Sequence, residues 1–132
     1  MMAEYADVDI ALDPVPYNGG TTTLQAMWMG VPVVVKEGGN FVSRMGASFM
    51  TAAGLSDWVA HDDDEYVEIA VRMAGDRESL LKLKQGMRER LLARPAWDIA
   101  KYVREFESSL RFMWTSHCKG VAPAPVRKRK SR

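Results

Sequence analysis

The chain has 132 residues, of which 47% are hydrophobic and 27% are charged. This apolar content is enough for one hydrophobic core and too little for two, so we expect one globular unit. The formal net charge of +1 argues against a nucleic-acid-binding surface that covers the whole domain.

The first half of the sequence predicts two strands joined by a helix. Residues 8–13 alternate as a short strand does, and two prolines, Pro14 and Pro16, end it because proline lacks the amide donor that a sheet ladder needs. A helix is predicted from Thr21 or Thr22 to Gly30. Residues 31–35 are apolar and mostly β-branched without a polar face, which indicates a strand that is covered on both sides in a parallel sheet.

The second half is predicted to be mostly helical. A helix over residues 41–53 is followed by a short strand over 57–60, and a third helix opens at 62–65 with an apolar stripe behind it. Apolar residues spaced by three and four predict two more helices, around 80–91 and 99–113. Strand, helix, strand, helix, short strand and then helices is an α/β pattern.

The predicted sheet is narrow. A doubly wound domain usually has five or six strands, whereas this sequence predicts about three short parallel ones. We therefore expect either the C-terminal half of a larger sheet or a sheet that borrows strands from a partner.

The C-terminal end differs in composition from the rest. Five of the 18 basic residues lie at positions 127–132, which leaves 13 basic against 17 acidic residues in the body. We expect residues 120–132 to be a disordered basic tail, and neither nucleic acid nor a membrane to be a partner. The lone Cys118 cannot form an internal disulfide, and no stretch reads as a signal peptide or a membrane span, so we expect a cytoplasmic protein.

The loop at residues 18–23, Asn-Gly-Gly-Thr-Thr-Thr, lies where a parallel strand ends and a helix begins. The first turn of a helix has unpaired amides and the positive end of the helix dipole, so an anion such as a phosphate is stabilised there. Gly19 and Gly20 would let the backbone approach the anion. The residues support a second interpretation equally well, in which Thr21 or Thr22 is only an N-cap beside a glycine turn.

Several stretches resemble one protein family. They are DIALDPVPYNGGTTTLQAMWMGVPVVV, SRMGASFMTAAGL, EYVEIAV, FESSLRFMW and CKG. Together they resemble the C-terminal part of the catalytic region of the O-linked N-acetylglucosamine transferase and SPINDLY family, including its bacterial members. The resemblance implies a GT-B glycosyltransferase, with residues 1–119 as a partial Rossmann-like domain that forms the C-terminal half of its nucleotide-sugar-binding domain.

The resemblance also implies roles for individual residues. The donor diphosphate would be held by the loop residues Gly19, Gly20, Thr21, Thr22 and Thr23. Gln25 lies where the family has an acidic residue that binds the ribose, and this departure removes a charge-assisted hydrogen bond. Asn18 and Arg44 are further candidates for the pocket, whereas the catalytic base is not identified.

No metal or other cofactor is expected. The run Asp62-Asp63-Asp64 looks like the DxD metal motif of other glycosyltransferases, but three acids at a helix start are ordinary capping and dipole partners. His61 and His117 flank helices, and we expect both at the surface.

The expected function is donor binding in a metal-independent glycosyltransferase. The sugar would come from UDP-N-acetylglucosamine or GDP-fucose and pass to Ser or Thr hydroxyls of a protein acceptor, which an N-terminal region outside this chain would hold. We expect the isolated chain to be an inactive monomer. The alternative is a noncatalytic α/β module that binds a protein or, weakly, a nucleotide.

Overall fold

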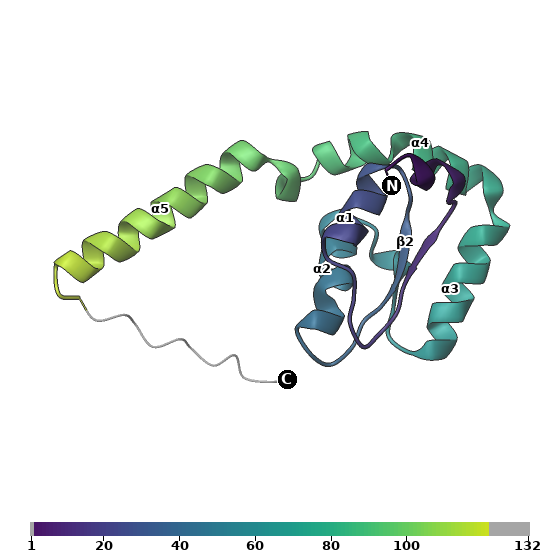
Figure 1. Cartoon of the computed structure of the whole chain (residues 1–132), viewed down its shortest axis with the longest axis horizontal. Coiled ribbons are helices and arrows are strands. Elements are labelled where there is room, and N and C mark those ends of the chain that lie inside the picture. The colour runs from purple at the N-terminus through teal and green to yellow at the C-terminus, as the bar shows by residue number, and fades with distance from the viewer. Residues whose placement is uncertain (1, 122–132) are drawn as a thin grey trace. The chain divides into compact units, whose positions relative to one another are not determined.

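The computed structural model describes residues 2–121, and Figure 1 shows the order of its elements. The chain forms two compact units that part between Trp97 and Asp98. The first contains the strands, and the second contains one long helix. The single domain predicted over residues 1–119 stays a prediction.

A three-stranded parallel sheet forms the centre of the first unit. Its strands, in the order in which they pair, are β1 (Ala11–Asp13), β2 (Val33–Lys36) and β3 (Val59–Ala60). Ala11 pairs with Val33 on one side of β2, and Val35 pairs with Val59 on the other. Because parallel strands run the same way, their carboxyl ends meet at one edge of the sheet.

Helices make up most of the remaining first unit. In chain order they are η1 (Ala3–Asp7), α1 (Thr21–Trp28), η2 (Val42–Arg44), α2 (Met45–Ala52), η3 (Ser56–Trp58), α3 (Asp63–Gly75), α4 (Arg77–Leu92) and η4 (Pro95–Trp97), where η marks a 3₁₀-helix. In Figure 1, α1 and α2 lie on one side of β2 and α3 on the other, and both α2 and α3 contact β2. The sheet is therefore covered on both faces, and the predicted α/β class with three parallel strands is confirmed.

The core lies around β2. Val33, Val34 and Val35 of this strand are all buried, and so are the methionines that three helices contribute to it. These methionines, Met27 in α1, Met50 in α2 and Met87 in α4, have no exposed surface. The apolar run of the sequence therefore forms most of the central strand, because a strand with neighbours on both edges and both faces can bury successive side chains.

Two glycines end helices where the sequence predicts. Gly30 follows α1 with φ of +86°, and Gly54 follows α2 with φ of +70°. Only glycine adopts this left-handed conformation at low cost. At Gly30 space is short as well, since a Cβ atom would lie 2.9 Å from the carbonyl oxygen of Lys84 in α4.

The boundaries of four predicted elements are wrong, and one of them is the second strand, which runs over Val33–Lys36 rather than 31–35. The first strand is β1 alone, so it begins at Ala11 rather than at residue 8. Residues 57–58 belong to η3, which leaves Val59 and Ala60 as the third strand. The predicted second helix begins as η2, because the Asn40 side chain accepts a hydrogen bond from the Ser43 amide (3.0 Å) and holds a tight turn there.

The second unit contains α5 (Ile99–Cys118). Asp98 caps it, since its Oδ1 accepts a hydrogen bond from the Lys101 amide at 2.8 Å. The helix and its apolar periodicity are as predicted, and the apolar side chains are exposed: Ile99, Tyr102, Val103, Phe106, Leu110 and Met113. Among the described helices, none is both long and apolar enough to span a membrane. The predicted tail lies outside the described residues, except for its first two positions, 120 and 121.

Candidate functional site

The Asn-Gly-Gly-Thr loop lies at the carboxyl end of β1 and leads into α1. Ligands of open parallel sheets bind outside the carboxyl ends of the strands, so the fold places this loop at the edge where a ligand would bind. Pro14 and Pro16 cannot continue the sheet ladder, which makes the chain leave the sheet directly after Asp13.

Asp13, which the sequence pattern does not single out, contacts this loop and the start of α1. The residue is only 7% exposed; its Oδ1 accepts a hydrogen bond from the Gly19 amide (2.7 Å) and its Oδ2 accepts one from the Thr23 hydroxyl (3.1 Å). Burial raises the pKa of Asp13, and hydrogen bonds from Gly19, Thr23 and Asn18 offset part of that rise. Burial and the Asp13 charge together raise the pKa of Tyr66 in α3.

Asn18 is completely buried and ties the loop to the sheet. Its Nδ2 donates to the carbonyl oxygens of Lys36 (3.1 Å), Pro14 (3.3 Å) and Asp13 (3.5 Å), and its amide donates to the carbonyl of Val42 (3.1 Å). Its Oδ1 is buried and finds no hydrogen-bond partner in the part of the chain that the structure describes. The side chain therefore faces the backbone beneath the loop, and a contact with a ligand stays a prediction.

The three threonines differ in orientation. Thr21 and Thr22 are exposed at the start of α1, whereas Thr23 is buried with its hydroxyl on Asp13. The N-cap interpretation of Thr21 or Thr22 is wrong, because both lie inside the helix and the N-cap is Gly20, which has no side chain. Among the described residues, none accepts a hydrogen bond from the backbone amides of Gly20, Thr21 or Thr22.

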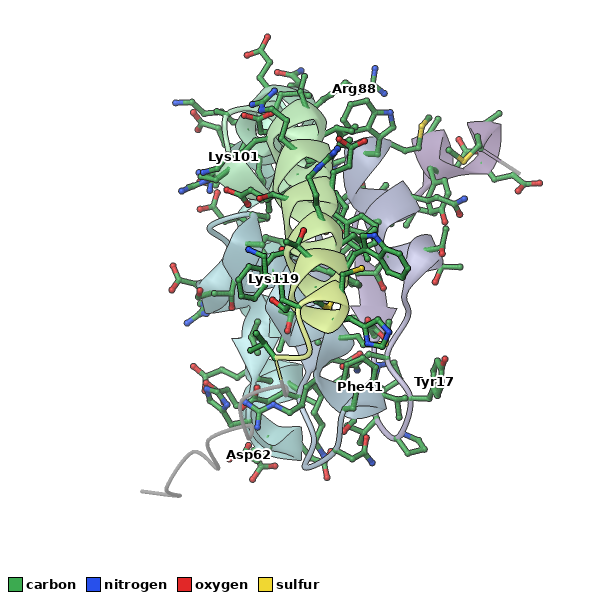
Figure 2. All side chains as sticks on the ribbon, turned by 90° about the vertical axis from the view of Figure 1, so that its left-hand side faces the viewer. Tyr17, Phe41, Asp62, Arg88, Lys101 and Lys119 are labelled. Atoms are coloured by element: carbon green, nitrogen blue, oxygen red, sulfur yellow. The ribbon has the colours of Figure 1, made fainter. Side chains whose placement is uncertain are left out.

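An open hollow of about 590 Å³ lies above these amides. Its polar side is formed by Gly19, Gly20, Thr21 and Thr22, and its apolar side by Leu24, Met45 and Phe49 together with Tyr17. Tyr17 is 68% exposed and extends from the loop into solvent; Phe41, which does not line the hollow, is 82% exposed (Figure 2). Four of the five predicted diphosphate contacts therefore line one hollow.

Four predicted residues do not line that hollow: the buried Asn18 and Thr23, and also Gln25 and Arg44. Gln25 is half-buried on the second turn of α1 and is not part of its lining. Arg44, whose side chain is 59% exposed, lines a separate hollow with Ser48. Its Nη2 lies 3.7 Å from Oε2 of Glu37. Glu37 also contacts His61 Nδ1 at 3.0 Å, so Arg44 belongs to an ionic cluster at the ends of β2 and β3.

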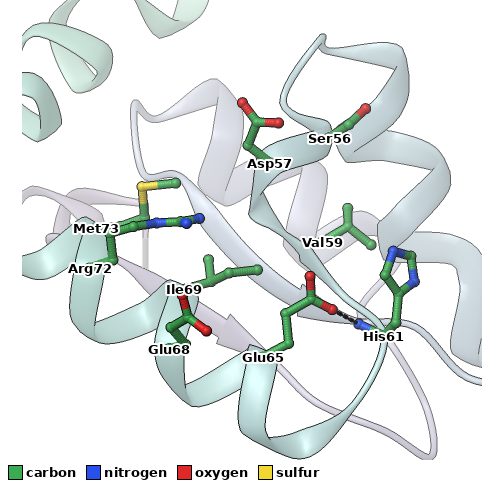
Figure 3. Close-up of a pocket in the computed structure, with 9 residues that line it drawn as sticks. All are labelled: Ser56, Asp57, Val59, His61, Glu65, Glu68, Ile69, Arg72 and Met73. Atoms are coloured by element: carbon green, nitrogen blue, oxygen red, sulfur yellow. Dashed lines mark hydrogen bonds between the residues drawn. The ribbon is translucent and has the colours of Figure 1, made fainter.

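The acidic run serves as a helix start, as predicted. Asp62 is the N-cap of α3 and accepts a hydrogen bond from the Glu65 amide (2.8 Å), while Asp63 pairs with Lys36. Figure 3 shows the neighbouring hollow, where Glu65 accepts a hydrogen bond from the His61 amide at 2.7 Å. The His61 ring is exposed, and so is His117 in α5, which confirms the predicted surface positions.

The described residues contain no group of three or more His, Cys, Asp or Glu placed to hold a metal ion. The loop itself presents amides and hydroxyls, which are donors to an anion rather than metal ligands. What the site can do chemically is to bind a phosphate-like group on the outer side of the Asp13-supported loop.

Residues 4–106, more than half of the chain, match glycosyl transferase family 41. The chain belongs to glycosyl transferase family 41. Its membership confirms the family resemblance seen in the motifs, whereas a bacterial origin stays a prediction.

The similar proteins include plant members of the family. A protein of Solanum lycopersicum named probable UDP-N-acetylglucosamine--peptide N-acetylglucosaminyltransferase SPINDLY is 41% identical over 123 residues, which cover 93% of this chain and 13% of that protein. The similarly named SEC protein of Arabidopsis thaliana is 32% identical over 87% of this chain and 12% of its own length. A family 41 chain of this size thus spans about an eighth of these relatives.

A solved structure supports the same assignment. A mutant O-GlcNAc transferase of Thermobaculum terrenum matches with a TM-score of 0.80 and 38% identity, over 92% of this chain and 23% of that one. For this family 41 chain, the partial α/β fold is therefore the one found in a solved glycosyltransferase.

Proposed function

We propose that the chain is the donor-binding segment of a protein O-glycosyltransferase. The observation that carries the proposal is the set of amides of Gly20, Thr21 and Thr22, which have no hydrogen-bond partner within residues 2–121 and lie beside an open hollow, in a chain of family 41. The donor would be UDP-N-acetylglucosamine or GDP-fucose, and the acceptor a Ser or Thr hydroxyl of a protein.

The loop would stabilise the leaving group of the sugar transfer, which is the nucleoside diphosphate. When the sugar is transferred, negative charge grows on the nucleoside diphosphate, and preorganised amides at the positive end of a helix stabilise such charge. Gly20 has no side chain that could cover the amides, and a Cβ atom there would lie 3.1 Å from the Met45 methyl group. The exposed hydroxyls of Thr21 and Thr22 add donors to phosphate oxygens, and no metal is required in this scheme.

Gln25 would bind the ribose through its amide, as the resemblance implies. The amide is neutral, so its hydrogen bonds to a sugar hydroxyl are weaker than those of a carboxylate. Asn18 and Arg44 would contribute indirectly, Asn18 by fixing the loop and Arg44 through the ionic cluster with Glu37.

We further propose that the 132-residue chain alone does not transfer sugar, and that it acts in a bacterial cytoplasm. The hollow is open to solvent, and the chain spans only 13% of the SPINDLY relative of Solanum lycopersicum. The groups that hold the acceptor and activate its hydroxyl would come from the part of the protein outside this chain. Measurable transfer to a peptide by the purified chain would contradict this proposal.

Donor binding can be tested by NMR titration of the labelled chain with UDP, GDP and their sugar conjugates. We expect shift changes concentrated in residues 18–25, and the nucleotide with the lower Kd identifies the donor. Thr22→Val removes one exposed hydroxyl and should raise Kd about tenfold. Thr51→Val, an exposed threonine of α2 away from the hollow, is the matched control and should leave Kd unchanged.

The same titration distinguishes the donor site from the alternative, a noncatalytic interaction module. If residues 18–25 do not respond to millimolar nucleotide, the donor-site proposal fails and a noncatalytic interaction module is favoured. Responses spread over α5 but absent from the loop would have the same meaning.

A further inference from the structure

A buried acid lies directly beneath the proposed donor loop. Asp13 ends β1, and its two carboxylate oxygens contact the two ends of the segment that carries the free amides: Oδ1 the Gly19 amide and Oδ2 the Thr23 hydroxyl. Between these anchors lie Gly20, Thr21 and Thr22, which line the hollow. The segment is thus held at both ends by one side chain.

We propose that Asp13 is the positioning residue of this loop, which it fixes by accepting the Gly19 and Thr23 hydrogen bonds so that the intervening amides are presented to a diphosphate. The inference rests on the proposed donor site and assigns a role to a residue that does not touch the ligand. By engaging the Gly19 amide and the Thr23 hydroxyl inwardly, Asp13 also decides which donors remain available on the outer side.

The surrounding packing is built for this arrangement. A Cβ atom on Gly19 would lie 2.3 Å from the Thr23 hydroxyl oxygen, so a side chain there would displace the group that Asp13 holds. A Cβ atom on Gly46 of α2 would lie 2.8 Å from Asp13 Oδ2. Two glycines therefore leave room for the carboxylate and its partner, one in the loop and one in the helix behind it.

To hold the loop, the side chain at position 13 needs atoms that accept hydrogen bonds, and it does not need a negative charge. A carboxylate near a diphosphate repels it, although the positive end of α1 stabilises both. Asparagine has nearly the same shape and keeps an acceptor for the Gly19 amide, and its Nδ2 can donate to the Thr23 hydroxyl oxygen. Asp13→Asn should therefore keep the loop in place while removing the charge beneath it.

The test measures Kd for inorganic pyrophosphate by calorimetry, because this probe reports on the phosphate-binding loop without the base or the sugar. Asp13→Asn should bind at least as tightly as the wild type, whereas Asp13→Ala and Thr23→Val should bind about tenfold more weakly. Asp57→Asn removes an exposed, distant charge and should match the wild type. Rescue by asparagine together with loss in alanine distinguishes positioning from a purely electrostatic effect.

Two results overturn the inference. One is wild-type affinity in both Asp13→Ala and Thr23→Val; the other is an Asp13→Asn variant as weak as Thr23→Val. The isosteric variants Asp13→Asn and Thr23→Val decide the matter if Asp13→Ala does not fold.

Failure of the proposed donor site can be distinguished from failure of the positioning role of Asp13. If the wild type does not bind millimolar pyrophosphate, the proposed function fails, and the NMR spectrum of the ligand-free protein then tests the positioning role. Thr23→Val should shift the amide signals of residues 19–22 while Asp57→Asn leaves them in place. Unchanged signals in Thr23→Val would refute the role of Asp13 whatever the ligand.

Discussion

Gly46 lets α2 pack against both β2 and the Asp13 carboxylate. A Cβ atom at this position would lie 2.7 Å from Cγ1 of Val35 and 2.8 Å from Oδ2 of Asp13, well inside van der Waals contact. Neither neighbour can yield easily, because Val35 is completely buried in the central strand and both Asp13 oxygens accept hydrogen bonds. Gly46→Ala must therefore displace the helix, the strand or the carboxylate.

The expected cost follows from three contributions. Overpacking a buried site costs about 1–3 kcal/mol. Weakening a hydrogen bond to the Asp13 carboxylate adds about 1.5 kcal/mol, and the better helix propensity of alanine returns up to about 1 kcal/mol. We expect the free energy of unfolding of Gly46→Ala to fall by about 1.5–3.5 kcal/mol.

The measurement is urea unfolding followed by far-UV circular dichroism. Gly86→Ala is the matched control, since Gly86 lies within α4 and a Cβ atom there would meet nothing within 4 Å. This control should be more stable than the wild type by up to about 1 kcal/mol. A Gly46→Ala protein as stable as the wild type would refute the packing argument. The Gly86→Ala control shows the effect of alanine at a helix position with free space, so a loss of stability in Gly46→Ala alone reports the lack of space at that position.

Three further predictions concern charged and polar side chains. Because burial raises the pKa of Asp13 above 3.8, the folded protein holds this proton more tightly than the unfolded chain, and the carboxyl loses its stabilising contribution as pH rises through the folded pKa. Asp13→Asn should therefore gain stability relative to the wild type between pH 3.8 and neutral pH in urea unfolding, and a pH-independent difference would contradict this. Gln25→Glu should bind UDP about tenfold more tightly in calorimetry if the side chain reaches the ribose, since a carboxylate accepts stronger hydrogen bonds; unchanged affinity would remove Gln25 from the site. In urea unfolding, Asp62→Ala should lower the free energy of unfolding by about 1 kcal/mol, because the N-cap of α3 is lost. Asp64→Ala should change it by only about 0.3 kcal/mol, and equal losses in the two variants would argue against capping.

The sequence predicts the strands and helices well where periodicity is strong. The apolar run at residues 31–35 overlaps β2 at residues 33–35, and Gly30 and Gly54 end helices as expected. Boundaries failed where local hydrogen bonds override the pattern, as at Asn40 and Ser43, which form a turn within a stretch predicted to be helical. Such side-chain turns compete with a helix on terms that apolar spacing does not describe.

The sequence predicts a loop between the first strand and the first helix, and the structure has this loop between β1 and α1, whereas donor binding there stays a prediction. Thr23 was grouped with its neighbours, yet it lies three and four residues before Ala26 and Met27, which are buried on the same face of α1. That spacing could have shown that Thr23 points inward. The role of Asp13 had no such signal, because it depends on a loop that brings Gly19 and Thr23 back to the end of β1.

The three completely buried methionines offer internal reporters of the fold. Met27, Met50 and Met87 come from α1, α2 and α4, so each helix places one thioether methyl group in the core. Labelling these methyl groups with ¹³C would follow the packing of each helix separately, even within a much larger protein. Because peroxide reaches a buried thioether only when the core opens, the rate of sulfoxide formation at these positions would measure that opening.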